Sequence, residues 1–436
     1  MMNYNNETYT VNSTGLVKKF IFISIIGTLL SIIGYYNDPR FFHSYLVCYM
    51  FFMTLSLGGL FFVLAHHIFG ADWSLPLRRF AENLMLLVPL MLILSVPIIL
   101  NFNSLYEWTD PIVEDSHAEH YDLEDSGHHH KSNLDHHESL KPHDDNFWSH
   151  HKTMVLKKSY LNKNFFFIRM AIYFIVWFLL ISRLYNLSIK QKTESDKMRL
   201  KTTSAAGIAI FALTISFFGF DAIMSLDPSW YSTMFGVYIF AGAYFSSIGF
   251  VLLVSLYLRS KSILVDEINE KHYSNLGKIA FAFTVFWSYI GGFQYYIIWY
   301  GNLPEEINWF LQRWEGPFKY ISLLLIIGHF IIPFSILIFN RLKRNKTVLT
   351  VMGGVILFIH WIDMYWLIMP NYFRDKHGHI KYEELNELSV LSWTDFSLML
   401  AMGGLLMAVY WRMFKTQPVV AFNDSAYKQS ITKEES

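Results

Sequence analysis

The sequence predicts an all-α polytopic membrane protein with ten transmembrane helices, arranged as two four-helix bundles and one flanking helix at each end of the chain. Of the 436 residues, 53% are hydrophobic and only 16% are charged, whereas a typical soluble domain carries about 25% charged residues. The apolar residues gather in ten blocks, each close to the ~20 residues that a helix needs to cross a bilayer. Two of the blocks also end in the same pattern, an aspartate followed by a proline seven positions later.

The ten expected spans follow these apolar blocks along the chain. They are residues 17–36, 45–69, 79–101, 165–185, 204–226, 233–258, 278–300, 318–340, 347–369 and 395–414. The stretch before the first span lacks the basic residues of a cleaved signal peptide, so the first span is expected to be retained. Pro89, Pro97 and Pro333 fall inside spans, where they favour kinks.

The spans divide the chain into four parts. These are an N-terminal tail with the first helix (1–36), a first four-helix bundle (37–228), a second four-helix bundle (229–370), and an outer loop with the last helix and a tail (371–436). An even number of helices gives both bundles the same orientation, related by an axis along the membrane normal. Runs of small residues at 56–59 and 246–249 match loosely, which favours an internal repeat.

The basic residues predict how the chain is oriented. With ten spans both termini lie on one side, and Lys and Arg concentrate on the cytoplasmic side of membrane proteins. Of the 35 Lys and Arg residues, 22 fall on the side of the termini. We therefore expect both termini in the cytoplasm and both Asp-to-Pro stretches toward the outer face.

The outer segment 101–164 differs in composition from the rest of the chain. Ten of the 18 histidines lie between His117 and His151, among many acidic residues. We interpret this segment as an insertion that forms a solvated, pH-responsive loop or a docking surface. Histidine-rich tracts can also bind Zn²⁺ or Cu²⁺, although the spacing here matches no closed metal site.

Composition excludes several classes of function. The 35 basic and 35 acidic residues cancel, which argues against a nucleic-acid partner. The single cysteine, Cys48, excludes a disulfide framework, a CxxCH haem attachment and a cysteine-ligated iron–sulfur cluster within this chain. No nucleotide-binding loop, nucleophile elbow or HExxH motif is present, so we expect no redox or hydrolytic chemistry from this chain alone.

The aspartates of the repeated pattern, Asp221 before Pro228 and Asp363 before Pro370, are the leading functional candidates. A charged side chain in the middle of a spanning helix costs roughly 2.5–3.5 kcal/mol, and such residues usually face the bundle interior and mark ion or proton routes. One interpretation is that both are protonatable stations on a route from the outer surface. The other is that each is a hydrogen-bonded residue that holds two helices together.

Two histidines are expected at the depth of Asp363. His360 lies three residues before it on the same helix face, and His329 lies at a similar depth on the preceding span. The three could form a proton relay, and two satisfied core histidines are an equally open interpretation. A haem b held by both histidines is disfavoured, because adjacent helices pack only about 8–10 Å apart.

Two further charged residues enter the list of proton-path candidates. Glu82 follows Arg78 and Arg79 at helical spacing, which favours an ion pair at the inner interface over the entrance of an inner half-channel. Arg169, near the outer start of the fourth span, could neutralise Asp221 or extend to the interface.

Three runs carry a resemblance to a known family. They are LAHHIFGADWSLPLRRFAENL (64–84), FFGFDAIMSLDPSWYSTMFGVYIFAGAYFSS (217–247) and LGKIAFAFTVFWSYIGGFQYYIIWYGNLPEEINWFLQRW (276–314). They resemble the F subunits of bacterial alternative complex III, a quinol:cytochrome c oxidoreductase, within the NrfD/PsrC-like group of membrane proteins. The third run is also similar to the C subunits of that complex. The chain is short for a C subunit, however, and it has Leu-Ala-His-His where those carry His-Ala-Gly-Thr.

The resemblance, which spans about residues 40–415, implies ten helices in two four-helix bundles and no cofactor bound to this chain. It implies a bacterial inner-membrane location and quinol oxidation in a paralogous ten-helix C-type subunit. Other implied partners are periplasmic subunits with iron–sulfur clusters and c-type haems, and a terminal oxidase. The implied role is a scaffold with a proton pathway.

Our main hypothesis is therefore a non-catalytic membrane subunit of such a respiratory complex. Its proton-path candidates are Asp221, Asp363, His360, His329, Glu82 and Arg169. One alternative is a quinol-binding, C-type subunit of the same complex. Another is a stand-alone proton-coupled transporter, although no pair of discontinuous helices of the kind that such transporters use is evident.

Overall fold

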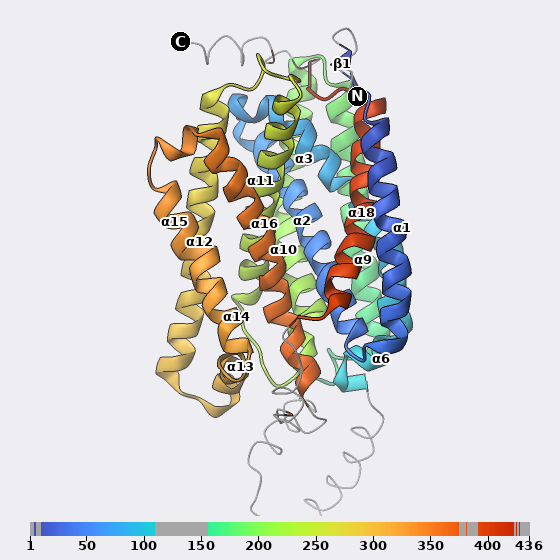
Figure 1. The fold of residues 1–436 in the computed structure, drawn as a ribbon, viewed down its shortest axis with the longest axis vertical. Helices are drawn as coiled ribbons and strands as arrows, with labels where there is room; N and C mark the ends of the chain where they lie inside the picture. The colour runs from blue at the N-terminus through green and yellow to red at the C-terminus, as the bar shows by residue number, and fades with distance from the viewer. Residues whose placement is uncertain are drawn as a thin grey trace, which may run out of the picture.

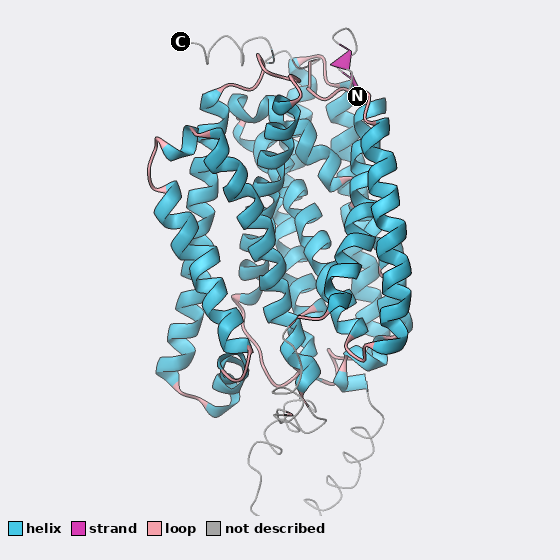
Figure 2. Ribbon diagram, viewed as in Figure 1, coloured by secondary structure: helices cyan, strands magenta, loops and turns pink. Residues whose placement is uncertain are grey.

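The structure, a computed structural model, describes residues 4–5, 10–109, 156–374, 381, 391–422, 424 and 427. Ten helical segments in this part of the chain are long and apolar enough to cross a membrane, and each coincides with one predicted span. The all-α, multi-pass architecture is thus confirmed (Figure 1). Figure 2 shows the helices running roughly parallel along the long axis. The strands of the described residues are the short antiparallel pair β1 (Tyr4–Asn5) and β2 (Thr10–Val11).

The N-terminal half contains the first flanking helix and the first bundle. Its helices are α1 (Thr14–Asn37), α2 (Phe41–Phe69), α3 (Arg78–Met85), α4 (Val88–Leu94), α5 (Val96–Leu100), α6 (Phe102–Leu105), α9 (Lys163–Lys190) and α10 (Glu194–Ala222), with the 3₁₀ turns η1 (Asp72–Leu77), η2 (Glu107–Thr109) and η3 (Met224–Leu226). The third span is thus a composite of η1 and α3 to α5.

The C-terminal half contains the second bundle and the other flanking helix. Its helices are α11 (Phe235–Ser260), α12 (Glu270–Gly301), α13 (Pro304–Trp314), α14 (Phe318–Leu325), α15 (Ile332–Leu337), α16 (Lys346–Ile368) and α18 (Trp393–Thr416), with the π turn η4 (Ile326–Ile331) and the 3₁₀ turns η5 (Leu342–Arg344) and η6 (Met369–Phe373).

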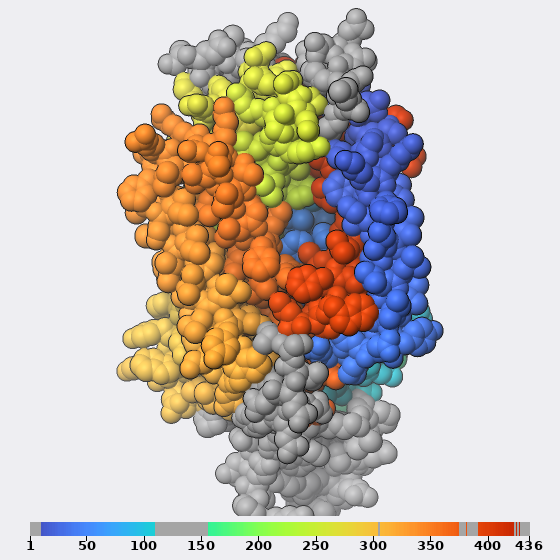
Figure 3. Space-filling view, viewed as in Figure 1, coloured from blue at the N-terminus to red at the C-terminus, as the bar shows by residue number. Residues whose placement is uncertain are grey.

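The two bundles pack against each other through their first helices. In the first bundle α2 contacts α3 and α10, and α9 contacts α4 and α10; in the second, α11 contacts α12 and α16, and α14 contacts α16. The two central helices α2 and α11 touch, and each also touches the last helix of the other bundle. Figure 3 shows the flanking helix α1 at one side of the molecule and the later helices of the second bundle at the other. The predicted pair of bundles with flanking helices is thus present.

Local sequence explains where helices begin and where they bend. Thr193 and Ser392 each form a capping box, with Asp196 and Asp395 as the third helical residue, which satisfies free backbone N–H groups at the helix start. Pro89 and Pro97 lie at the starts of α4 and α5, where the third span is broken. A proline lacks the N–H that the preceding turn requires, so this span bends as predicted.

Small residues allow the two central helices to approach closely. A Cβ added at Gly58 of α2 would lie 2.0 Å from the Ala243 carbonyl oxygen and 2.9 Å from the Ser247 Cβ, both on α11. Such close backbone contacts hold membrane helices together by packing alone. The two small-residue runs that match in the sequence therefore meet at the contact between the bundles.

Polar contacts join the two halves next to the loop that follows α10. The Lys157 ammonium donates to the Trp230 carbonyl at 3.3 Å, and the Arg374 guanidinium pairs with the Asp227 carboxylate at 2.5 Å. Burial lowers the pKa of the Lys157 ammonium, while Asp227 acts in the opposite direction. The histidine-rich stretch between His117 and His151 lies outside the described residues, and so does the interpretation placed on it.

Candidate functional site

Asp221 and Asp363 occupy corresponding positions near the C-terminal ends of α10 and α16, and neither side chain is exposed to solvent. Their neighbours nevertheless differ. Asp221 is surrounded by side chains of the first bundle and Asp363 by side chains of the second. The two matching sequence patterns thus produce two chemically distinct sites.

An arginine neutralises Asp221. Arg169 of α9 donates from Nε and Nη2 to the two carboxylate oxygens, both at 2.9 Å, and the Tyr173 hydroxyl donates to Oδ2 at 2.8 Å. The guanidinium also lies over the Tyr160 ring, 3.9 Å from its centroid. Burial and the nearby Asp221 carboxylate raise the pKa of the Tyr160 phenol. Of the two interpretations that the sequence left open for Arg169, the structure shows the pairing with Asp221, and it is bidentate, which is the strong form of this interaction.

Asp363 has no such cation. The Tyr238 hydroxyl of α11 donates to Oδ1 at 2.5 Å, and the Trp287 indole of α12 donates to Oδ2 at 3.3 Å. Within the described part of the chain, no lysine or arginine forms an ion pair with it. The nearest equivalent of Arg169 is the buried Arg313, whose guanidinium donates instead to the Trp309, Trp366 and Leu367 carbonyls.

The structure brings His329 and His360 together with Asp363. One ring nitrogen of each histidine and one carboxylate oxygen lie within 4.8 Å of one another, and all three side chains are fully buried. The His329 ring stacks on Trp287 with a centroid separation of 3.6 Å. Neither His329 nitrogen has a hydrogen-bond partner among the described residues, nor does His360 Nδ1. Buried polar atoms normally have partners, so this concentration of unsatisfied nitrogens marks the cluster as unusual.

Local sequence places these three groups. His360 and Asp363 share a face of α16 because they are three residues apart. His329 lies in the π turn η4, four residues before Pro333. Pro333 cannot donate the backbone hydrogen bond that the His329 carbonyl would receive in an α-helix, and the backbone here bonds over five residues, from Ile332 to Ile327. Single π turns in α-helices are frequent at functional sites.

The cluster has the donor types of a transition-metal site. A divalent ion held by these residues would meet only one carboxylate, so an excess positive charge would stay buried in an apolar region, which is costly. A single proton leaves no such excess. For the same three groups a proton is therefore the cation that the charge balance favours.

The remaining candidate, Glu82, lies at the opposite end of the molecule. Its carboxylate pairs with Arg78 Nε at 3.2 Å and with Arg79 Nη1 at 2.5 Å, and it accepts from the Ser188 hydroxyl at 2.5 Å. The predicted ion pair is confirmed, and it is fully buried. Arg78 also pairs with Asp424 at 3.0 Å. Glu82 therefore belongs to a charge network separate from the Asp363 cluster.

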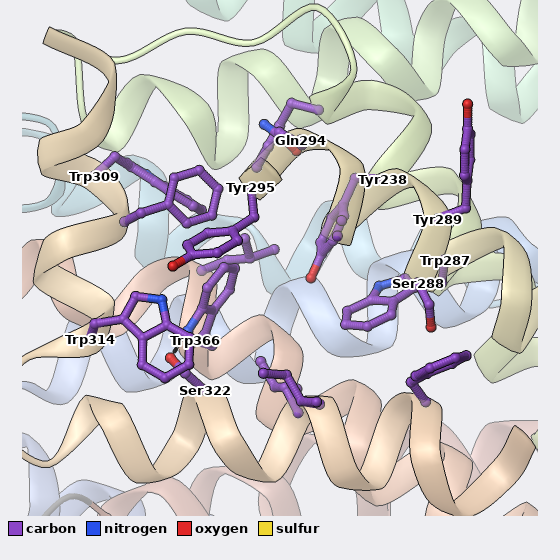
Figure 4. Close-up of a pocket in the computed structure, with 18 of the residues that line it drawn as sticks. Tyr238, Trp287, Ser288, Tyr289, Gln294, Tyr295, Trp309, Trp314, Ser322 and Trp366 are labelled. Atoms are coloured by element: carbon purple, nitrogen blue, oxygen red, sulfur yellow. Dashed lines mark hydrogen bonds between the residues drawn. The ribbon is translucent and has the colours of Figure 1, made fainter. Parts of the chain in front are cut away.

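An aromatic cavity of about 510 Å³ adjoins the Asp363 cluster in the second bundle. Tyr238 and Trp287, which both donate to Asp363, form part of its wall. Figure 4 shows these two side chains near one another, with Trp309, Trp314 and Trp366 gathered at the other end. A molecule in this cavity would touch the two residues that hold the Asp363 carboxylate.

Sequence reasoning missed the partners of the aspartates. Tyr238, Trp287 and Tyr173 come from helices other than those of the carboxylates they contact. Hydropathy treats all three as ordinary apolar positions, and only Trp287 and Tyr238 lie in runs that carried the family resemblance. A search for hydroxyl and indole donors at the depth of each buried aspartate would have selected them among other aromatics.

Comparison with protein-family models and with curated proteins gave no match to this chain.

Proposed function

We propose that this chain is a membrane subunit of a bacterial respiratory quinol:acceptor oxidoreductase complex, in which the second bundle exchanges protons and the first bundle acts as a scaffold. The family resemblance of three sequence runs and the arrangement of two four-helix bundles with flanking helices support this proposal. The chain would bind no redox cofactor itself. Its partners would be a paralogous ten-helix subunit, periplasmic iron–sulfur and c-type haem subunits, and a terminal oxidase.

One observation carries the proton-exchange part: Asp363 is fully buried beside two histidines and lacks the cation that neutralises Asp221. A permanently charged carboxylate is expensive in an apolar interior unless it is paired. The hydrogen bonds from Tyr238 and Trp287 lower that cost when the proton leaves. Asp363 can thus exist in both protonation states, which a proton carrier requires.

The expected orientation of the chain indicates which side of the membrane the Asp363 cluster faces. With both termini in the cytoplasm of an inner-membrane protein, Asp363 lies toward the periplasmic side. Protons released by quinol oxidation in a neighbouring C-type subunit would then pass through the second bundle near its outer face. The first bundle would contribute rigidity, because its aspartate is held by Arg169.

The test is Asp363→Asn in the assembled complex, with Asp221→Asn as the matched variant. We expect Asp363→Asn to preserve assembly and to slow proton release during quinol turnover by roughly 100-fold or more, as for loss of a general acid–base group. Asp221→Asn leaves Arg169 without its carboxylate, so it should lower stability and assembly first. Unchanged proton release and quinol oxidation in Asp363→Asn would overturn the proton-exchange part and leave the scaffold.

The aromatic cavity favours a second candidate function, that of a quinol-binding, C-type subunit. Its wall of tryptophans and tyrosines suits a flat ring, and two of its residues donate to Asp363. Solvent extraction of the purified chain followed by chromatography of quinones tests this. Stoichiometric quinone that is lost in Trp314→Ala would support quinol binding, and its absence from the wild-type chain would contradict it.

A further inference from the structure

Thr54 of the central helix α2 reaches across the contact between the two bundles to His360. Its Oγ1 lies 2.9 Å from His360 Nε2, and both side chains are fully buried. The same oxygen lies 2.7 Å from the Met50 carbonyl and 3.1 Å from the Phe51 carbonyl on its own helix. Thr54 thus gives the first bundle a polar contact with the Asp363 cluster, beside the Phe51 ring of the same helix, which packs on His360.

Counting donors decides the direction of the hydrogen bond to His360. A threonine hydroxyl has one proton to donate and two lone pairs that accept. The Met50 and Phe51 carbonyls can only accept, so the hydroxyl proton goes to one of them. Thr54 Oγ1 must then accept from His360, and the neutral imidazole carries its proton on Nε2. This assigns the tautomer from the hydrogen-bond network.

The other ring nitrogen of His360, Nδ1, is then unprotonated and can accept a proton from Asp363. His360 Nδ1 has no hydrogen-bond partner among the described residues. A Cβ added at Gly242 of α11 would lie 3.2 Å from His360 Nδ1 and 3.6 Å from Asp363 Oδ2. Both atoms therefore border the same small space, which the missing side chain of Gly242 leaves open.

The groups around this space come from every element packed on it. Tyr238 contributes a phenol from α11, Trp287 an indole from α12, and η4 contributes His329. The buried Arg313 of α13 donates its N–H groups to the Trp366 and Leu367 carbonyls. The groups that exchange protons here are thus Asp363 and the two imidazoles.

We propose that Thr54 is a positioning residue that holds His360 with its proton on Nε2, so that a proton from Asp363 enters and leaves the imidazole only at Nδ1. In the step, the O–H bond of the Asp363 carboxyl breaks and an N–H bond forms at Nδ1, which converts a neutral pair into a carboxylate and an imidazolium. Net charge is conserved, and no electron moves.

A second consequence is that Thr54 ends the route on the side of the first bundle. The Thr54 hydroxyl donates its proton to a backbone carbonyl of α2. A carbonyl carries no proton that it could transfer further. A proton on His360 therefore leaves through Nδ1, back to Asp363 or on to His329, whose two nitrogens have no partner among the described residues. This inference rests on the proposed proton exchange at Asp363 and makes the second bundle its sole location.

The test uses Thr54→Val, which keeps the shape and removes the acceptor, with Thr54→Ser as the rescue variant. The purified complex is labelled with ¹⁵N-histidine, and His360 is identified by the signal lost in His360→Gln. We expect the wild type and Thr54→Ser to show a protonated Nε2 and a bare Nδ1. Thr54→Val should show mixed tautomers and proton release that is slower by roughly tenfold, the value of one buried hydrogen bond.

A second variant tests the contact without altering Thr54. Gly242→Ala places a methyl group 3.2 Å from His360 Nδ1 and 3.6 Å from Asp363 Oδ2, and Gly219→Ala is its control, because its Cβ would meet Ile239 of α11 at a similar 3.2 Å. Slower proton release in Gly242→Ala alone supports the transfer at Nδ1. An unchanged tautomer and unchanged proton release in Thr54→Val would overturn the role of Thr54, even where Asp363→Asn still slows release.

Discussion

The first bundle neutralises its buried aspartate with an arginine, whereas the second bundle surrounds the corresponding aspartate with a phenol, an indole and two imidazoles. Asp221 accepts three hydrogen bonds, two of them from Arg169. Asp363 accepts two, both from neutral donors. A shared sequence pattern therefore gives a fixed ion pair in one half and a chargeable group in the other.

The difference depends on where each bundle uses its buried arginine. Arg169 of α9 points at the aspartate, while Arg313 of α13 stacks on Trp309, 3.4 Å from the ring centroid, and donates to the carbonyls near the end of α16. Unsatisfied carbonyls at a helix end favour a cation. In the second bundle the arginine thus stabilises the helix that carries the aspartate and leaves the carboxylate unpaired.

The largest effect is expected from breaking the ion pair of the first bundle. Arg169→Met leaves a buried carboxylate without its cation, so the free energy of unfolding should fall by about 3–5 kcal/mol. Denaturant unfolding of the purified chain in detergent measures this loss, and Arg183→Met, at an exposed position of the same helix, is the control. Replacing both partners, as in Arg169→Met with Asp221→Leu, should recover most of the stability. A small loss in Arg169→Met would show that the two aspartates are held alike.

For the two tyrosines that donate to the aspartates, we expect smaller losses of stability, and here the second bundle should lose more than the first. Tyr238→Phe leaves Asp363 with only the indole donor, so it should cost about 1.5–3 kcal/mol, the value of a hydrogen bond to a charged group. Tyr173→Phe leaves Asp221 with both bonds from Arg169 and should cost about 1 kcal/mol or less. Denaturant unfolding curves of the two variants measure both losses. Equal losses would contradict this prediction.

The smallest effect is expected between Arg313 and Asp363. In a double-mutant cycle with Arg313→Gln and Asp363→Asn, the coupling energy should stay below about 0.5 kcal/mol, the range of sites that share no contact. The cycle of Arg169→Met and Asp221→Asn should give a coupling well above that. A strong coupling of Arg313 with Asp363 would mean that the second bundle also neutralises its aspartate, and the contrast would disappear.

Hydropathy was sufficient to predict the ten spans, because a helix must satisfy its own backbone inside a bilayer. The same reasoning selected Asp221 and Asp363 and named Arg169 as one possible partner, since buried charges in membranes need partners. It could not choose between Arg169 pairing and interfacial exposure, because that depends on which face of α9 meets α10.

The residues around Asp363 could not be predicted from the sequence for a related reason. Thr54, Tyr238 and Trp287 lie 306 positions from His360, and 125 and 76 positions from Asp363, respectively. No local pattern encodes which hydroxyl or indole of a distant helix arrives at a given depth. The sequence did place His360 on the face of Asp363, and it placed Pro333 four residues after His329, which is the cause of the π turn.

That π turn changes the rotation of one helix about its own axis. Each residue of an α-helix advances about 100°, so a turn that holds one residue more offsets everything on its far side by about that angle. The lipid-facing stripe of α14 is thereby displaced relative to that of α15, and a deletion of one residue between Ile326 and His329 would rotate His329 by about 100° relative to α14.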